Sequence, residues 1–167
     1  MDKSLLRQAI IDRLQSDLDV LTRAALMARE EATDEESKPK EEYETRAQEA
    51  AYLAESQARL ASELQASLAL YKGMPMPDFS KNGQPADAGA LIRLEAGEGN
   101  GGGKGDVWYF LGLRNGGIEL TVDNIPVTLV TLQSPLGRQL AGARVGDVVQ
   151  LQTGRDAPVP HRVAELF

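Results

Sequence analysis

The chain contains no cysteine and a single histidine, His161. The lack of cysteine excludes disulfides, thiol catalysis and cysteine-ligated zinc, and one histidine excludes sites built from several histidines. No apolar run approaches the roughly 18 residues that a membrane-spanning helix needs, so we expect no membrane partner. Acids interrupt the first apolar residues and no small-residue cleavage site follows, which predicts no signal peptide. We therefore expect a cytoplasmic protein.

Positive charge is also scarce. Among 167 residues, 25 are Asp or Glu and 18 are Lys or Arg, which gives a net charge of −7. A protein that binds free nucleic acid needs a basic surface for the phosphates, so sequence recognition of free DNA is not expected.

Glycine is absent from the first 72 residues, whereas residues 73–167 hold all 16 glycines and seven of the eight prolines. The first part is rich in Ala, Leu, Glu, Gln and Arg, which are strong helix formers. The second part alternates apolar and polar residues between glycine and proline, a pattern typical of short strands and turns. We expect a helical domain over 1–72, a linker over 73–89 and a globular domain over 90–167.

Apolar positions in the first part follow the heptad spacing of a coiled coil. The positions form two series with mirrored spacing. When the chain folds back just before Pro39, each position of the first series lies opposite one of the second. The spacing predicts an antiparallel hairpin with helices from about Ser4 to Ala32 and from about Lys40 to Tyr71. The seam near the tip is mostly alanine, so we expect the helices to approach closely there. The two series are Ile11, Leu14, Leu18, Leu21, Ala25, Ala28, Ala32 and Tyr43, Ala47, Ala50, Ala54, Gln57, Ala61, Leu64.

The predicted tip is strongly acidic, with eight carboxylates in residues 30–44. Glu41 and Glu42 fall in the first turn of the second helix, where the helix dipole favours acids. Such a cluster at the end of a thin rod can offer oxygen ligands to a cation such as Mg²⁺. A solvated charged surface is the alternative interpretation.

Segments 86–96, 107–113, 126–132, 148–153 and 161–166 read as strands. A short helix is predicted after Ser134, with Pro135 in its first turn and Gly142 closing it. The chain as a whole is therefore expected to be α+β, with a helical hairpin followed by a small antiparallel sheet and one short helix.

Residues 134–154, SPLGRQLAGARVGDVVQLQTG, resemble the C-terminal signature of the GreA/GreB transcript cleavage factors. That signature has a Ser-Pro-Leu-x-Arg-x-Leu helix, then Gly-x-x-Val-Gly-Asp and a strand. The order of parts is also similar: an antiparallel coiled coil with an acidic tip, a linker and an FKBP-like domain. The resemblance implies a transcription elongation factor that binds bacterial RNA polymerase.

In that family the coiled coil enters the secondary channel of the polymerase, and the polymerase then hydrolyses the backtracked RNA 3′ end. The resemblance implies that the protein is an accessory factor rather than an enzyme, and a monomer. It implies no metal held stably by the free protein and a Mg²⁺ shared with the polymerase active site. The tip acids that would assist this Mg²⁺ are Asp34, Glu35 and Glu36.

The resemblance also places a docking surface on the C-terminal domain, formed by Ser134, Pro135, Leu136 and Arg138. Basic residues flank the tip acids and are suited to contact RNA phosphate or the channel wall. These residues are Arg29, Lys38, Lys40 and Arg46.

The tip departs from the family pattern, because Thr33 replaces a glycine and the interval from Asp34 to Tyr43 is two residues longer. Glu41 is a further candidate for the second acid. A factor that occupies the channel without promoting cleavage, and a hairpin that self-associates as a structural protein, therefore remain open. Prolyl isomerase activity is not expected, because consecutive aromatic residues at 108–110 cannot all face one pocket.

Overall fold

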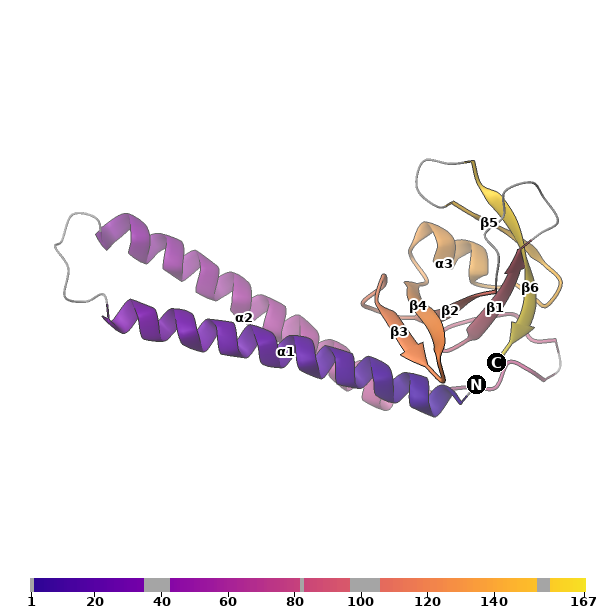
Figure 1. The fold of residues 1–167 in the computed structure, drawn as a ribbon, viewed down its shortest axis with the longest axis horizontal. Coiled ribbons are helices and arrows are strands. Elements are labelled where there is room, and N and C mark those ends of the chain that lie inside the picture. Colours follow the sequence, from indigo (N-terminus) through magenta and orange to yellow (C-terminus); the bar gives the residue numbers. More distant parts are fainter. Residues whose placement is uncertain (1, 35–42, 82, 97–105, 153–156) are drawn as a thin grey trace. The chain divides into compact units, whose positions relative to one another are not determined.

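The computed structural model describes residues 2–34, 43–81, 83–96, 106–152 and 157–167; the side chains of 29–34 and 43–47 are outside this description. The chain divides into two compact units, Ile10–Gly73 and Met1–Ala9 with Met74–Phe167. Two long helices are followed by six strands and one short helix (Figure 1). This order confirms the predicted α+β class. None of the helices described is both long and apolar enough to cross a lipid bilayer.

The predicted helices are both present, as α1 (Lys3–Asp34) and α2 (Tyr43–Gly73). They lie side by side in the first unit (Figure 1). On α1, Leu14 is fully buried and Leu18 is half-buried, and on α2 Ala61 and Leu64 are half-buried. Burial at these four heptad positions agrees with their predicted place between the helices. At the start of the series the fully buried residue is Ile10, and the predicted Ile11 is half-buried.

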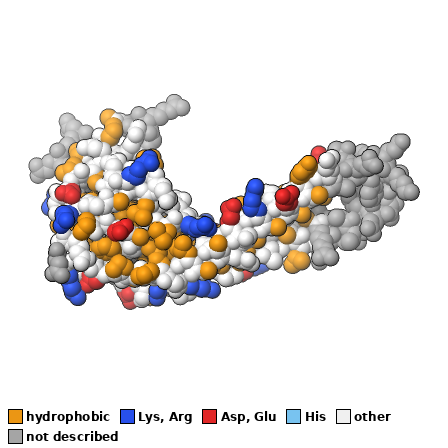
Figure 2. All heavy atoms as spheres, turned by 180° about the vertical axis from the view of Figure 1, so that it is seen from behind, with side chains coloured by type: hydrophobic (Ala, Val, Ile, Leu, Met, Phe, Trp, Pro, Cys, Tyr) orange, Lys and Arg blue, Asp and Glu red, His pale blue; other side chains and the backbone are white. Residues whose placement is uncertain are grey.

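Toward the tip, the alanine seam does not close as the sequence suggested. Ala28, Ala50 and Ala54 are exposed, and a groove of about 450 Å³ runs between the helices. Alanine side chains are too short to fill the space between two helix backbones at an ordinary separation. Figure 2 shows that apolar side chains interrupt the polar surface along the described hairpin. The groove is lined by Leu21, Thr22, Ala25, Ala28, Ala50, Leu53, Ala54, Gln57, Ala58 and Ala61.

The sheet of the second unit has the strand order β3-β4-β2-β1-β6-β5. All neighbouring pairs are antiparallel except β2 and β4, which are parallel. β3 was not predicted from the sequence. Because β3 runs opposite to β2, the chain reverses direction once more before β4, and β4 can therefore run parallel to β2. The strands are β1 (Leu91–Ala96), β2 (Val107–Gly112), β3 (Glu119–Val122), β4 (Ile125–Thr131), β5 (Val148–Leu151) and β6 (Val159–Leu166).

The turn between β3 and β4 has two residues, Asp123 and Asn124, with φ of 53° and 62°. Two consecutive positive φ values define a type I′ hairpin turn, whose twist matches that of the strands. Asp and Asn tolerate this region better than other non-glycine residues. The Asp-Asn pair was therefore the available signal for β3.

The main hydrophobic core lies on one face of the sheet. Ile92 and Leu94 of β1 and Leu111 of β2 are fully buried in it, and Tyr109 packs against it. Trp108, on the opposite face, stacks on Phe167 with 5.9 Å between ring centroids. Adjacent aromatic residues of β2 thus face opposite sides of the sheet, as the alternation of a strand requires.

Residues 74–89 contain no helix or strand among those described, but they pack into the second unit. Met74, Phe79 and Ala86 are buried. The Ala86 N–H donates to the Ala143 carbonyl at 2.8 Å, and the Ala86 carbonyl accepts from the Gly142 N–H at 2.7 Å. The segment that the sequence suggested as a linker is therefore held by backbone hydrogen bonds to the residues that follow the short helix.

Lys3, in the first turn of α1, also belongs to this second unit. Its Nζ donates to the carbonyls of Pro77 and Gly89 and lies 5.2 Å from the centre of the Phe79 ring. Burial lowers the pKa of Lys3, and the nearby carboxylate of Asp78 partly opposes this shift. The ammonium group thereby ties the first turn of α1 to the 74–89 segment.

The groove between α1 and α2 gives a first prediction. Ala54→Leu is expected to stabilise the protein by about 1 kcal/mol, because the added carbons bury apolar area in the groove. Ala66→Leu, at an exposed position of α2 that does not line the groove, is the matched control. Urea unfolding followed by circular dichroism measures both variants, and equal midpoints for the two would show that the groove does not accept the side chain.

Candidate functional site

The short helix α3 (Pro135–Leu140) begins with a compact cap. The Ser134 Oγ accepts from the Gly137 N–H at 2.9 Å and donates to the Thr131 carbonyl at 2.8 Å. Pro135 occupies the first turn, where no backbone donor is needed. The structure confirms the helix and cap that Ser134 and Pro135 predicted. One hydroxyl thus joins the end of β4 to the start of α3.

Gly137 lies buried within α3, and its role was not predicted from the sequence. A Cβ at this position would lie 1.8 Å from the Thr131 carbonyl oxygen and 2.7 Å from its carbonyl carbon. No side chain fits at these distances from backbone atoms. Glycine lowers the stability of a helix, so a glycine inside a predicted helix indicates that the position has a packing role.

Two clefts meet at this cap. The first, of about 520 Å³, is lined by α3, β5 and Pro158, and the second, of about 460 Å³, by α3, β4 and the loop after β2. Both include Tyr109, Pro135 and Leu136. Volumes of this size fall within the range of small-molecule pockets.

The predicted docking residues are distributed unequally around these clefts. Pro135 and Leu136 line both, and Ser134 lines the second. Arg138 is exposed and lines neither of the two. The structure therefore brings three of the four residues to one rim and leaves Arg138 on the adjoining surface of α3.

Tyr109 contributes the aromatic ring shared by the two clefts. Burial raises the pKa of its phenol above the ordinary value of 10.0, so the hydroxyl remains protonated at neutral pH. It can therefore donate a hydrogen bond as well as accept one.

The predicted tip residues are placed only in part. Asp34 is the last residue of α1, Arg29 lies in the preceding turns and Arg46 lies in the first turn of α2. Their side chains are outside the description, and Glu35, Glu36, Lys38 and Lys40 fall in the gap between the described ranges. Within the part that is described, no group of three or more acidic or histidine side chains is suited to hold a metal.

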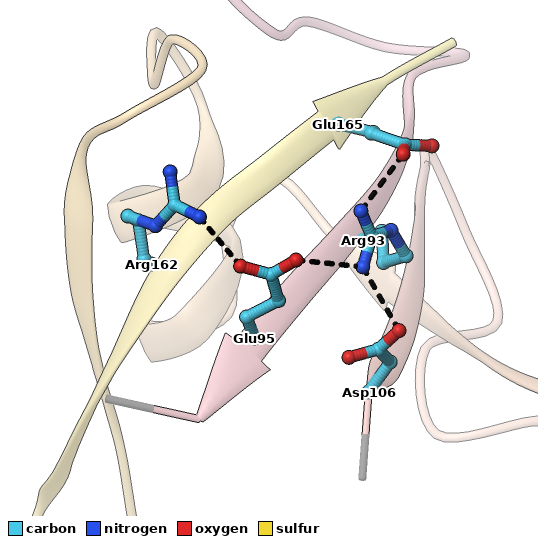
Figure 3. A network of polar contacts seen from close by, with 5 residues as sticks. All are labelled: Arg93, Glu95, Asp106, Arg162 and Glu165. Carbon is cyan, nitrogen blue, oxygen red and sulfur yellow. Dashed lines mark hydrogen bonds and ion pairs between the residues drawn. The ribbon is translucent and has the colours of Figure 1, made fainter. Parts of the chain in front are cut away.

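A charged network crosses the sheet face opposite the main core (Figure 3). Arg93 of β1 reaches Glu95 and Asp106 at 2.9 Å each and Glu165 at 2.7 Å. Glu95 also pairs with Arg162 at 2.6 Å. The bonds from Arg162 and then Arg93 lower the pKa of Glu95. Because these five side chains pair with one another across β1, β6 and the start of β2, we interpret the network as a brace of the sheet rather than a ligand site.

His161 lies in β6 and is 7% exposed. Its Nδ1 is 3.1 Å from the Val159 carbonyl, and the residue pairs with Val149 of β5 and Ala96 of β1 in the sheet. His161 is therefore a buried residue of a strand that is flanked on both sides by other strands.

No family model matches the chain, and no curated protein matches it. Several solved structures do match it. Two are the GreA factor homolog 1 (Gfh1) of Thermus thermophilus and the Gfh1 of Thermus aquaticus, each 16% identical with a TM-score of 0.37. The alignments cover 94% of this chain and 94% of the first structure, and 95% of this chain and 94% of the second. A third is a prokaryotic transcription elongation factor GreA/GreB from Nitrosomonas europaea, 13% identical with a TM-score of 0.38, over 72% of this chain and 92% of that one. Because these TM-scores are low, the function proposed below is drawn from the residues of the chain itself.

The contact between Gly137 and Thr131 gives a second prediction. Gly137→Ala is expected to lower the free energy of unfolding by about 3 kcal/mol, because α3 must move away from β4 to admit the methyl group. Gly73→Ala is the control, since a Cβ at Gly73 meets nothing within 4 Å. Chemical unfolding of both variants tests this, and a Gly137→Ala protein as stable as the Gly73→Ala protein would contradict the close approach.

Proposed function

We propose that this protein is a transcription elongation factor that binds bacterial RNA polymerase in the cytoplasm. The hairpin of α1 and α2 would enter the secondary channel, and the C-terminal unit would dock at the channel rim. The observation that supports the proposal is the cap of α3, where Ser134, Pro135 and Leu136 of the GreA/GreB-like signature lie together beside the two clefts. The hairpin with its acidic tip supplies the second feature of that family.

The docking surface would be formed by Pro135 and Leu136, with Ser134 fixing the turn and Arg138 beside it. Pro135 and Arg138 are exposed, and Leu136 is half-buried against the two clefts. An apolar centre with a charged residue at its edge is a common arrangement in protein interfaces. The acidic net charge is compatible with this partner, because the contacts proposed are with protein rather than with bare nucleic acid.

The tip would assist hydrolysis of the backtracked RNA 3′ end without making the protein an enzyme. Asp34, with Glu35 or Glu36, would offer carboxylate oxygens toward Mg²⁺ shared with the polymerase active site. Basic residues beside them would hold the RNA phosphates or contact the channel wall. These residues are Arg29, Lys38, Lys40 and Arg46. A factor that fills the channel without promoting cleavage is the closest variant of this proposal, because the tip departs from the family pattern.

The test uses purified bacterial RNA polymerase halted in a backtracked complex with labelled RNA. The protein is expected to shorten the RNA, and the Asp34→Ala/Glu35→Ala/Glu36→Ala variant is expected to lose at least about tenfold in cleavage rate while still binding. A variant with Glu49→Ala/Glu55→Ala/Glu63→Ala, from the described part of α2, controls for the loss of three acids.

Binding without shortening, together with protection against an active cleavage factor, would instead identify a channel-occupying regulator. Failure to co-migrate with the polymerase would overturn the proposal in both forms.

Exposed apolar side chains on the hairpin favour a second candidate, a structural protein that self-associates. Val20, Leu26 and Met27 on α1 and Tyr52 and Leu53 on α2 are all more than half exposed, between 54% and 65%. Two such hairpins could bury these side chains against each other as a four-helix bundle. Sedimentation at low micromolar concentration is expected to show a monomer if the polymerase proposal holds. A stable dimer that Leu53→Glu dissociates would favour the structural protein.

A further inference from the structure

The strand β5 lies at one edge of the sheet. The side chain of Gln139 forms hydrogen bonds with the backbone groups of β5 that point away from the sheet. The Gln150 N–H donates to the Gln139 Oε1 at 2.9 Å, and the Gln139 Nε2 donates to the Gln150 carbonyl at 3.3 Å. A carboxamide that both donates and accepts offers the same pair of bonds as one residue of a neighbouring antiparallel strand. Gln139 of α3 therefore stands where the backbone of another strand would stand.

The partner strand explains why these groups of Gln150 are available. Gln150 is paired with Pro160 of β6. Pairs in an antiparallel ladder alternate between hydrogen-bonded and non-hydrogen-bonded sites, so the N–H and carbonyl of Gln150 point away from β6. Val148, two residues earlier on the same edge, is 61% exposed.

The first cleft of about 520 Å³ lies beside this edge. Gln139 and Gln150 line it together with the apolar side chains of Tyr109, Leu136 and Leu151 and with Pro158. Among the residues that the structure describes, those that line the cleft are uncharged. An occupant that matches the cleft is therefore uncharged, with apolar side chains at alternate positions and an extended backbone.

We infer that the β5 edge and its cleft bind an extended, uncharged segment of another protein chain, which adds to the sheet as a further strand by displacing the Gln139 carboxamide. The backbone of the segment takes the two bonds to Gln150, and one apolar side chain enters the cleft over Leu136 and Tyr109. The cleft shares Pro135 and Leu136 with the docking surface of the proposed function, but the inference does not rest on that function, and its test needs no polymerase.

The probe is the peptide Ac-Ser-Val-Thr-Val-Ser-NH2, added to the full-length ¹⁵N-labelled protein and followed by NMR. The expected result is saturable shifts at the Gln150 and Gln152 amides and at the Gln139 carboxamide. Gln139→Ala removes the competing amide and is expected to bind the peptide about fivefold more tightly. Gln84→Ala, an exposed glutamine of the 74–89 segment, is the control and is expected to bind as the parent does.

A second peptide of the same sequence, methylated at its central peptide nitrogens, keeps the side chains but cannot donate to a strand. It is expected to lose binding. Equal binding of the methylated peptide would overturn the inference, because the segment would then not pair with β5. The absence of shifts with millimolar peptide in both the parent and Gln139→Ala would overturn it as well.

Discussion

The contact between the Thr131 carbonyl and Gly137 is the constraint on which the C-terminal unit depends. The end of β4 and the first turn of α3 approach so closely that a single methyl group would meet backbone atoms at 1.8 Å. The Ser134 hydroxyl bridges the same two backbone groups, so the turn is defined by hydrogen bonds as well as by space. This turn places Pro135 and Leu136 at the rim of both clefts, and the proposed docking surface follows from it.

The helix α3 also contacts the edge strand β5. α3 is only six residues long, yet its Gln139 reaches the edge of β5 while Ser134 holds the end of β4. The helix therefore connects an inner strand to an edge strand. A shift of its first turn would be transmitted to the β5 edge, so the packing at Gly137 bears on both surfaces.

Much of this fold could be predicted from local patterns. The heptad positions predicted both long helices, and Ser134 with Pro135 predicted the cap of α3. The features that were missed depend on contacts between distant residues or on weak signals. Residues 74–89 pack in place because Ala86 pairs with residues 142 and 143. The signal for β3 was the turn at Asp123 and Asn124, which is weaker than an Asn-Gly pair. The hydrogen bonds between Gln139 and Gln150 join a helix to a strand and leave no local sequence pattern. The alanine seam was misjudged near the tip because heptad spacing fixes which residues face each other, not how closely the helices approach.

Photo-cross-linking tests the central claim most directly. A benzoylphenylalanine probe replaces Met27, which is 62% exposed on α1, and in a second protein it replaces the exposed Arg138 of α3. Both are mixed with bacterial RNA polymerase and irradiated. The account predicts that the probe at position 27 attaches to the wall of the secondary channel and the probe at position 138 to its outer rim. Cross-links from position 27 only to a second copy of this chain, with none to polymerase from either position, would contradict it.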